Sequence, residues 1–148
     1  MLSADQLRAA LVAAGIPNEA CRIFGEDREC TMPSWVSGEF AAAFEKFLFS
    51  SGVSSRDGQF ECHQFAKLAT SMADLCWFKT GRSEAGLALG MFGYLASGGH
   101  MICVGVHAAA KGGFYVAFYE PQNMGNGFMR PVVLSEEEIR SCTSCFFI

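Results

Sequence analysis

Three side chains of this 148-residue chain, Cys62, His100 and Glu120, are of the types that nucleophilic catalysis by a thiol requires. The thiol needs a base within hydrogen-bond reach, and a third group must hold that base, wherever the three residues fall in the sequence. A cysteine becomes a good nucleophile where the free amides and partial positive charge of a helix N-terminus stabilise its thiolate. Secondary structure therefore decides whether these three residues can work together.

Cys62 is expected in the first turn of a helix from about Cys62 to Trp77. Apolar residues repeat there at intervals of three and four, the spacing of one helix face, namely Phe65, Leu68, Ala69, Met72, Ala73 and Cys76. A turn-forming stretch from Ser50 to Gly58 precedes this helix. Cysteine is also among the most buried residue types, so a purely structural Cys62 is the alternative interpretation.

His100 and Glu120 are expected at the open end of one β-hairpin. Two alternating segments predict its strands, with Ile102, Val104 and Val106 in the first and Phe114, Val116 and Phe118 in the second. If residues 108–113 close the hairpin so that His107 faces Phe114, His100 lies beside Glu120 and Pro121. His63 is the second choice for the base, and His107 is expected to be a turn residue that faces solvent.

Helices are expected before strands along the chain, which indicates an α+β fold with an antiparallel sheet. The first helix runs from about Ala4 to Ala14, with Ser3 as its cap and Gln6 completing a capping box. A second helix is expected over about 38–49, a short strand over 131–134, a helical turn at Ser135–Glu138 and a last strand over 142–148. We expect one domain over 1–148, helical to about residue 84 and sheet from about residue 85.

Composition excludes several classes of function. The net charge is -4 and the basic residues are scattered, so no nucleic-acid partner is expected. A stretch of 26 residues between Glu84 and Lys111 carries no Asp, Glu, Lys or Arg, but its glycines and its alternation favour buried sheet and loop over a membrane helix. The N-terminus shows no export signal, so a cytoplasmic protein is expected.

Seven cysteines without an export signal favour reduced thiols. Cys142 and Cys145 form a CxxC pair, but with no second pair and no nearby histidine a zinc site is the less favoured interpretation, and two cysteines of a strand the more favoured one. Trp35 and Trp77 could each line a groove or fill the core.

Three short motifs together resemble a known family. They are Phe60-Glu61-Cys62-His63-Gln64-Phe65-Ala66, then Ser97-Gly98-Gly99-His100, then Phe118-Tyr119-Glu120-Pro121-Gln122. Their order and spacing are similar to those of the C-terminal domain of the fairy-ring mushroom agglutinin family, which has related stand-alone domains in phages and bacteria. The resemblance covers about residues 60–122. The family often has acidic residues directly after the cysteine, where this chain has His63 and Gln64.

The resemblance implies a papain-like fold and cysteine protease activity, with Cys62 as nucleophile, His100 as base and Glu120 as the residue that orients the base. Gln122 matches the family's Glu-Pro-Gln motif, and Gln59 and Gln122 are candidates for the second oxyanion donor. No cofactor follows from the residues themselves, whereas the resemblance implies calcium. A peptide or protein substrate is expected, and amide hydrolysis in peptidoglycan, transglutamination and a catalytically silent binding module, such as a phage component or effector, remain alternatives.

Overall fold

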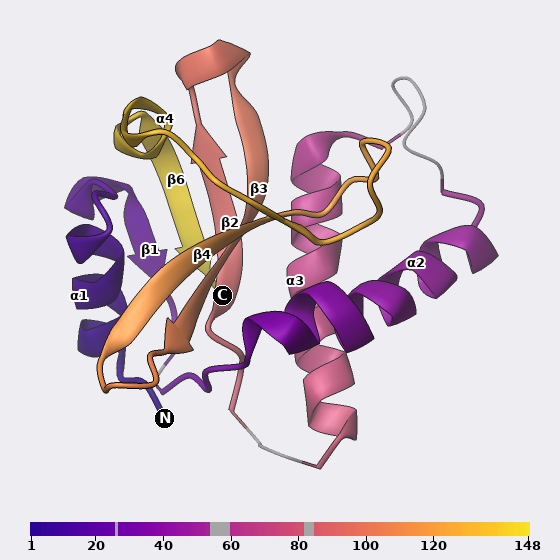
Figure 1. Cartoon of the computed structure of the whole chain (residues 1–148), viewed down its shortest axis with the longest axis horizontal. Coiled ribbons are helices and arrows are strands. Elements are labelled where there is room, and N and C mark those ends of the chain that lie inside the picture. The colour runs from indigo at the N-terminus through magenta and orange to yellow at the C-terminus, as the bar shows by residue number, and fades with distance from the viewer. Residues whose placement is uncertain (26, 54–59, 82–84) are drawn as a thin grey trace.

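A computed structural model describes residues 1–25, 27–53, 60–81 and 85–148. The chain has an α+β fold built on a six-stranded sheet with the strand order β1-β6-β2-β3-β4-β5. Figure 1 shows helices on both sides of this sheet. The strands are β1 (Cys21–Ile23), β2 (Leu89–Tyr94), β3 (His100–Ala108), β4 (Phe114–Glu120), β5 (Arg130–Val132) and β6 (Cys142–Phe147).

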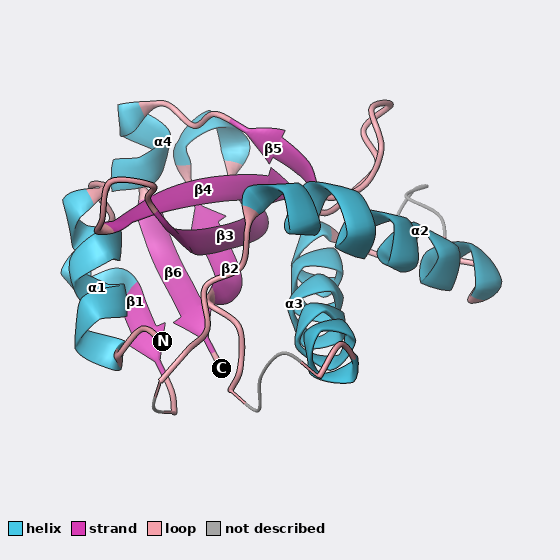
Figure 2. Cartoon of the chain, turned by 60° about the horizontal axis from the view of Figure 1, so that its bottom comes forward, coloured by secondary structure: helices cyan, strands magenta, loops and turns pink. Residues whose placement is uncertain are grey.

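Four α-helices and three helical segments of 3-10 or π type surround the sheet in the described part of the chain, with α1 on one side and α2 and α3 on the other (Figure 2). They are α1 (Ala4–Ala13), η1 (Asn18–Ala20), the π-helical segment η2 (Trp35–Phe40), α2 (Ala41–Ser50), α3 (Cys62–Lys79), η3 (Ala96–Gly98) and α4 (Glu136–Arg140). The capping box of Ser3 and Gln6 begins α1 as predicted.

Each face of the sheet has its own hydrophobic core. Alternate residues of β3 divide between the two cores, because successive side chains of a strand point to opposite faces. Ile102, Val104 and Val106 pack with Leu7 and Leu11 of α1. The opposite core holds Cys103 with residues of η2, α2 and α3, which include Trp35, Phe40, Phe44, Phe65, Ala69 and Trp77. Both tryptophans are buried, so they are core residues rather than the walls of an open groove.

Several predicted elements are confirmed and others are corrected. The helix predicted from Cys62 is present, and it continues two residues beyond Trp77 to Lys79. The predicted helix over 38–49 is the end of a longer helical stretch that begins at Trp35. Strands β1 and β2 were not predicted individually, and β1 runs parallel to β6, so the sheet is mixed rather than antiparallel.

The β3–β4 hairpin forms with a register one residue away from the predicted one. His107 pairs with Tyr115, not with Phe114, which pairs with Ala108. The expectation that His107 faces solvent is wrong, because it lies inside β3 and is 1% exposed. The uncharged stretch before Lys111 folds mainly into β2 and β3, and within the described ranges no helix is long and apolar enough to cross a membrane.

Candidate active site

Cys62 is the first residue of α3, where a catalytic thiol would profit from the free amides of the helix N-terminus. Glu61 is the N-cap, and its backbone amide donates to Oε1 of Gln64 over 2.7 Å. Phe60, the residue before Glu61, packs edge-to-face on Phe65. These contacts fix the entry into the helix, and Cys62 remains half-buried rather than sealed in the core.

His100 begins β3 directly after a tight turn that only unusual backbone angles allow. Ser97 has a φ of 61°, and Gly98 and Gly99 also have positive φ values, which glycine adopts without steric cost. The hydroxyl of Ser141, at the end of α4, accepts hydrogen bonds from the amides of Leu95 (3.2 Å) and Ala96 (2.9 Å). The turn that delivers His100 is therefore attached to α4.

His100 and Glu120 meet at the end of the hairpin, as predicted. Nε2 of His100 lies 2.6 Å from Oε2 of Glu120, with side-chain exposures of 27% and 6%. The other oxygen of Glu120 accepts the backbone amide of Gln122 over 3.2 Å. Because Glu120 engages Nε2 of the ring, Nδ1 is the nitrogen left for the thiol of Cys62.

The electrostatics of His100 connect the three residues. Its hydrogen bond with Glu120 raises the pKa of His100 above the ordinary value, and the negative charge of Glu120 acts in the same direction. A hydrogen bond with Cys62 and the charge of Cys62 raise this pKa further, while burial opposes them. The imidazole is thus paired with the carboxylate, and Cys62 lies near enough to influence the protonation of His100.

Tyr94 completes the surroundings of His100. It pairs with His100 across β2 and β3, and the two rings pack edge-to-face with centroids 6.2 Å apart. Burial raises the pKa of the Tyr94 phenol, and the charges of Glu138, Glu120 and Cys62 raise it further. The prediction missed Tyr94 because β2 was not recognised; pairing of an adjacent strand with His100 would have been the signal.

The remaining predicted site residues have different outcomes. His63 is exposed and lies 3.5 Å from the carboxylate of Glu61, so it is engaged outside the His100–Glu120 pair. Gln122 follows β4 next to Glu120, and its backbone supports that carboxylate. Gln59 lies outside the described residues.

The described residues next to Cys62 provide no cluster of acidic side chains for a calcium ion. There, no three His, Cys, Asp or Glu side chains gather as metal ligands. Next to the thiol, Gln64 already accepts the amide of Glu61, and His63 pairs with Glu61. Cys142 and Cys145 are likewise not part of a group of three such ligands among the described residues, as a zinc site would need. Both are buried in β6.

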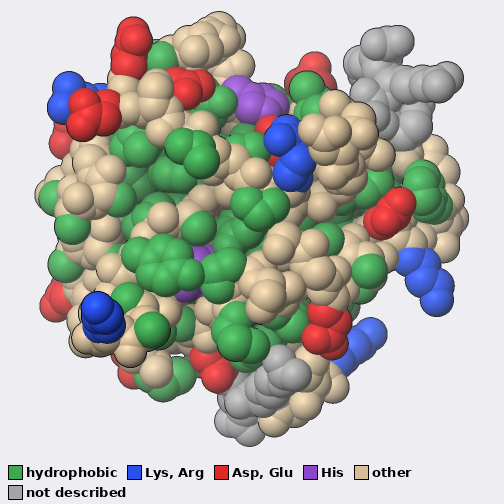
Figure 3. Space-filling view, viewed as in Figure 1, with side chains coloured by type: hydrophobic (Ala, Val, Ile, Leu, Met, Phe, Trp, Pro, Cys, Tyr) green, Lys and Arg blue, Asp and Glu red, His purple; other side chains and the backbone are tan. Residues whose placement is uncertain are grey.

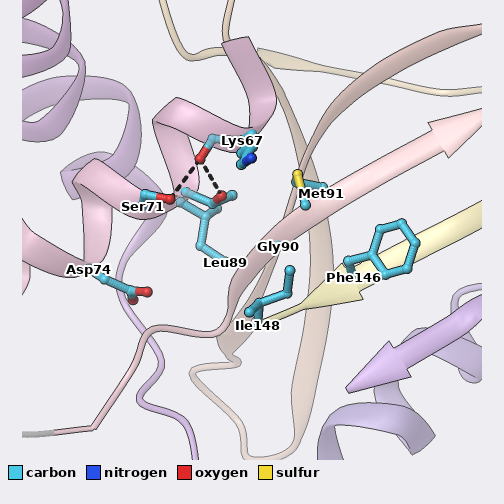
Figure 4. Close-up of a pocket in the computed structure, with 9 residues that line it drawn as sticks. Lys67, Ser71, Asp74, Leu89, Gly90, Met91, Phe146 and Ile148 are labelled. Carbon is cyan, nitrogen blue, oxygen red and sulfur yellow. Dashed lines mark hydrogen bonds between the residues drawn. The ribbon is translucent and has the colours of Figure 1, made fainter. Parts of the chain in front are cut away.

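One cavity of about 190 Å³ lies away from the three residues, between α3 and the ends of β2 and β6 (Figure 4). Lys67, Asp74 and Ile148 are part of its lining. The hydroxyl of Ser71 at its wall donates to the carbonyl oxygen of Lys67 within α3. None of Cys62, His100 and Glu120 lines this cavity, so it is separate from the candidate active site.

One face of the molecule is unevenly charged. Acidic side chains gather over α4 in the view of Figure 3, and hydrophobic side chains occupy much of the middle of the same face. The three acidic residues of α4 are Glu136, Glu137 and Glu138.

The fold is similar to that of a solved structure, whereas the sequence matches no known family. No family model and no curated protein matches this chain. It is similar to a solved structure described as the PSL1a–E64 complex, with a TM-score of 0.68 and 17% sequence identity. The match covers 98% of this chain and 50% of that chain, so this chain spans half the length of the solved one. At this identity, the likeness shows a common α+β fold.

Proposed function

We propose that this chain is a papain-like cysteine hydrolase that cleaves peptides, with Cys62 as nucleophile, His100 as general base and acid, and Glu120 as the residue that orients His100. The observation that carries the proposal is the 2.6 Å contact of His100 with Glu120, together with the influence of Cys62 on the same imidazole. A nucleophile, a base and an orienting group within mutual reach are what acyl transfer to a thiol requires.

In the proposed reaction, the sulfur of Cys62 attacks the carbonyl carbon of an amide and its proton passes to His100. The backbone amide of Cys62 at the start of α3 stabilises the oxyanion, and the side chain of Gln122 is the candidate for a second donor. His100 then gives its proton to the leaving amine, and a thioester remains. Water, deprotonated by His100, attacks this thioester, which releases the acid and returns the thiol.

The comparison supports the choice of reaction. The similar solved structure is a complex with E64, an inhibitor of cysteine proteases. We propose peptides as substrates by analogy with papain-like folds, and we further propose that the chain belongs with the agglutinin-type domains that its three motifs resemble. No calcium step is part of this mechanism.

Mapping of iodoacetamide alkylation by mass spectrometry tests the proposal. Near pH 6, where an ordinary thiol of pKa about 8.5 is protonated, a nucleophile at the start of α3 that is activated by His100 should react faster than the other cysteines. Cys103 is the slow internal reference, because burial raises its pKa far above the ordinary value. In His100→Ala, we expect the rate at Cys62 to fall by about tenfold or more.

His63→Ala is the matched control, since it removes the neighbouring imidazole and should leave the rate at Cys62 unchanged. Cys21→Ser is needed as a second background, because Cys21 also has a lowered pKa of about 7. If Cys62 reacts no faster than Cys76, the hydrolase proposal fails and a catalytically silent module with this fold is left. Fast, His100-dependent labelling justifies a peptide substrate screen, with Cys62→Ala as the inactive reference.

A further inference from the structure

Two buried thiols lie opposite each other outside the candidate active site. Cys21 of β1 and Cys145 of β6 are direct partners in the parallel pairing of these strands. Their exposures are 1% and 0%, and both belong to the core that α1 covers. The proposed hydrolase mechanism uses neither of them.

The two paired thiols influence each other's protonation. The hydrogen bond with Cys145 is the main reason that the pKa of Cys21 is lowered to about 7, and the charges of Arg8 and Arg22 contribute. The same hydrogen bond is the main reason that the pKa of Cys145 is raised, followed by its burial. Cys21 is therefore the more acidic thiol of the pair, and in the folded chain its Sγ donates to the carbonyl oxygen of Pro17 over 3.6 Å.

The backbone spacing suits a covalent bond between these residues. Neighbouring strands lie about 4.7–4.9 Å apart, and disulfides join Cα atoms about 4.4–6.8 Å apart. We propose that Cys21 and Cys145 are a thiol–disulfide modification site that takes small disulfides such as oxidised glutathione and converts them into an internal bond between β1 and β6.

The reaction has two exchange steps. The thiolate of Cys21 attacks one sulfur of oxidised glutathione, which forms a mixed disulfide and releases one glutathione thiolate. The thiol of Cys145 then loses its proton, and its sulfur attacks the sulfur of Cys21, which releases the second glutathione. Two protein thiols are oxidised and one glutathione disulfide is reduced to two thiols.

The first step makes the second one easier. While Cys21 is a thiolate, its hydrogen bond and its charge both hold the proton on Cys145. A mixed disulfide at Cys21 carries no charge and no longer accepts that hydrogen bond. Cys145 then loses its proton more readily and is already next to the sulfur that it must attack.

Access to the buried pair comes from β1. This strand has three residues, lies at the edge of the sheet and pairs with β6 alone. Short edge elements open locally at a low free-energy cost compared with global unfolding. An oxidant can therefore meet Cys21 while the rest of the sheet stays folded.

Cys142 is the competing partner. It lies on β6, three residues before Cys145, and burial raises its pKa to about 11. It has no direct pairing with Cys21, because the β1–β6 register begins at Cys145. We therefore expect a bond between Cys21 and Cys145, which peptide mapping can distinguish from a bond between Cys142 and Cys145.

The experiment exposes the folded chain to oxidised and reduced glutathione at stepped ratios, blocks free thiols with iodoacetamide and maps non-reduced peptides by mass spectrometry. We expect a peptide that links Cys21 to Cys145. We also expect the melting temperature to rise by about 5 °C, because the bond closes a long loop. Cys145→Ser should stop at a glutathione adduct on Cys21, and Cys21→Ser should leave Cys145 unmodified.

Cys76→Ser is the matched control and should still form the linked peptide. The proposal is overturned if the bond joins Cys142 to Cys145, or if Cys21 stays free under conditions in which the half-buried Cys76 has reacted. Cys21→Ala and Cys145→Ala replace the serine variants if these do not fold. The linked peptide of Cys21 and Cys145 does not contain Cys62, so this result is independent of whether the hydrolase proposal holds.

Discussion

Nε2 of His107 lies 2.7 Å from the hydroxyl of Tyr119 in the core between the sheet and α3. Nδ1 of the same ring lies 2.8 Å from the backbone oxygen of Thr31. A carbonyl can only accept, so Nδ1 carries a proton; burial lowers the pKa of His107 and disfavours a second one, so Nε2 accepts from the hydroxyl of Tyr119. His107 is therefore neutral and fully partnered, whereas His100, on the same strand, is paired with a carboxylate.

His107 should make the fold sensitive to acid. Burial lowers the pKa of His107, so the unfolded chain binds more protons there than the folded chain below about pH 6.5. Its contribution to the free energy of unfolding should therefore fall as the pH drops from about 7 to 5. In urea titrations, the difference in stability between wild type and His107→Gln should shrink as the pH falls. A difference that is constant with pH would contradict this assignment.

Glu120→Gln should give the opposite pH dependence. The hydrogen bond with Glu120 raises the pKa of His100, so the stabilisation is complete below about pH 6.5 and is lost as the pH rises through the folded value. The stability difference between wild type and Glu120→Gln should therefore be largest near pH 6 and smaller near pH 9. Nuclear magnetic resonance titration of the ring should show a lower pKa for His100 in the variant.

Glu61→Gln is the matched control for Glu120→Gln. It removes the carboxylate of the exposed pair with His63 and keeps the pair of His100 with Glu120. The titration of His100 should be unchanged in this variant. Equal shifts in both variants would show that general charge, rather than the direct contact, sets the protonation of His100.

Gly105 leaves room for the ring of His107. A Cβ at this position would lie 2.8 Å from Nε2 of His107 and 3.2 Å from a ring carbon of Tyr119. Gly105→Ala should therefore destabilise the fold by about 1–3 kcal/mol, the usual cost of overpacking. Gly38→Ala, where a Cβ would meet nothing within 4 Å, should be neutral or slightly stabilising. Equal urea midpoints for the two variants would contradict the steric argument.

The elements with local signals were predictable from sequence. Capping residues and a spacing of three and four identify α1 and α3, and alternation identifies the hairpin. That was enough to bring His100 and Glu120 together. The one-residue error in register did not matter there, because a glutamate at a strand end can reach a histidine across the hairpin in either register.

The remaining parts depend on tertiary contacts. Strand β2 is buried on both faces and does not alternate, and a side chain at its Gly90 would collide with the backbone of Phe146. Strand β1 is too short to have a pattern of its own. The burial of His107 depends on Thr31 and Tyr119, which are distant in sequence. Cys21 and Cys145 meet only because the two ends of the chain pair in one sheet.

Ser141 should position the turn that carries His100. Its hydroxyl accepts from the amides of Leu95 and Ala96, and it donates to the carbonyl of Glu138. Ser141→Ala removes the hydroxyl that accepts hydrogen bonds from these amides, which should lower the free energy of unfolding by about 1 kcal/mol. If Cys62 and His100 act as proposed, the alkylation rate of Cys62 should also fall several-fold, because a looser turn holds the imidazole less well.

Ser71→Ala separates positioning from stability. The hydroxyl of Ser71 donates to the carbonyl of Lys67 within α3, so this variant removes a hydroxyl from an exposed helix face. The alkylation rate of Cys62 should then stay at the wild-type value. A Ser141→Ala protein that is less stable but still alkylated at the wild-type rate would show that Ser141 stabilises α4 and the turn without directing His100. Ser141→Thr keeps the hydroxyl and should restore most of the rate, since the same two amides would again have an acceptor.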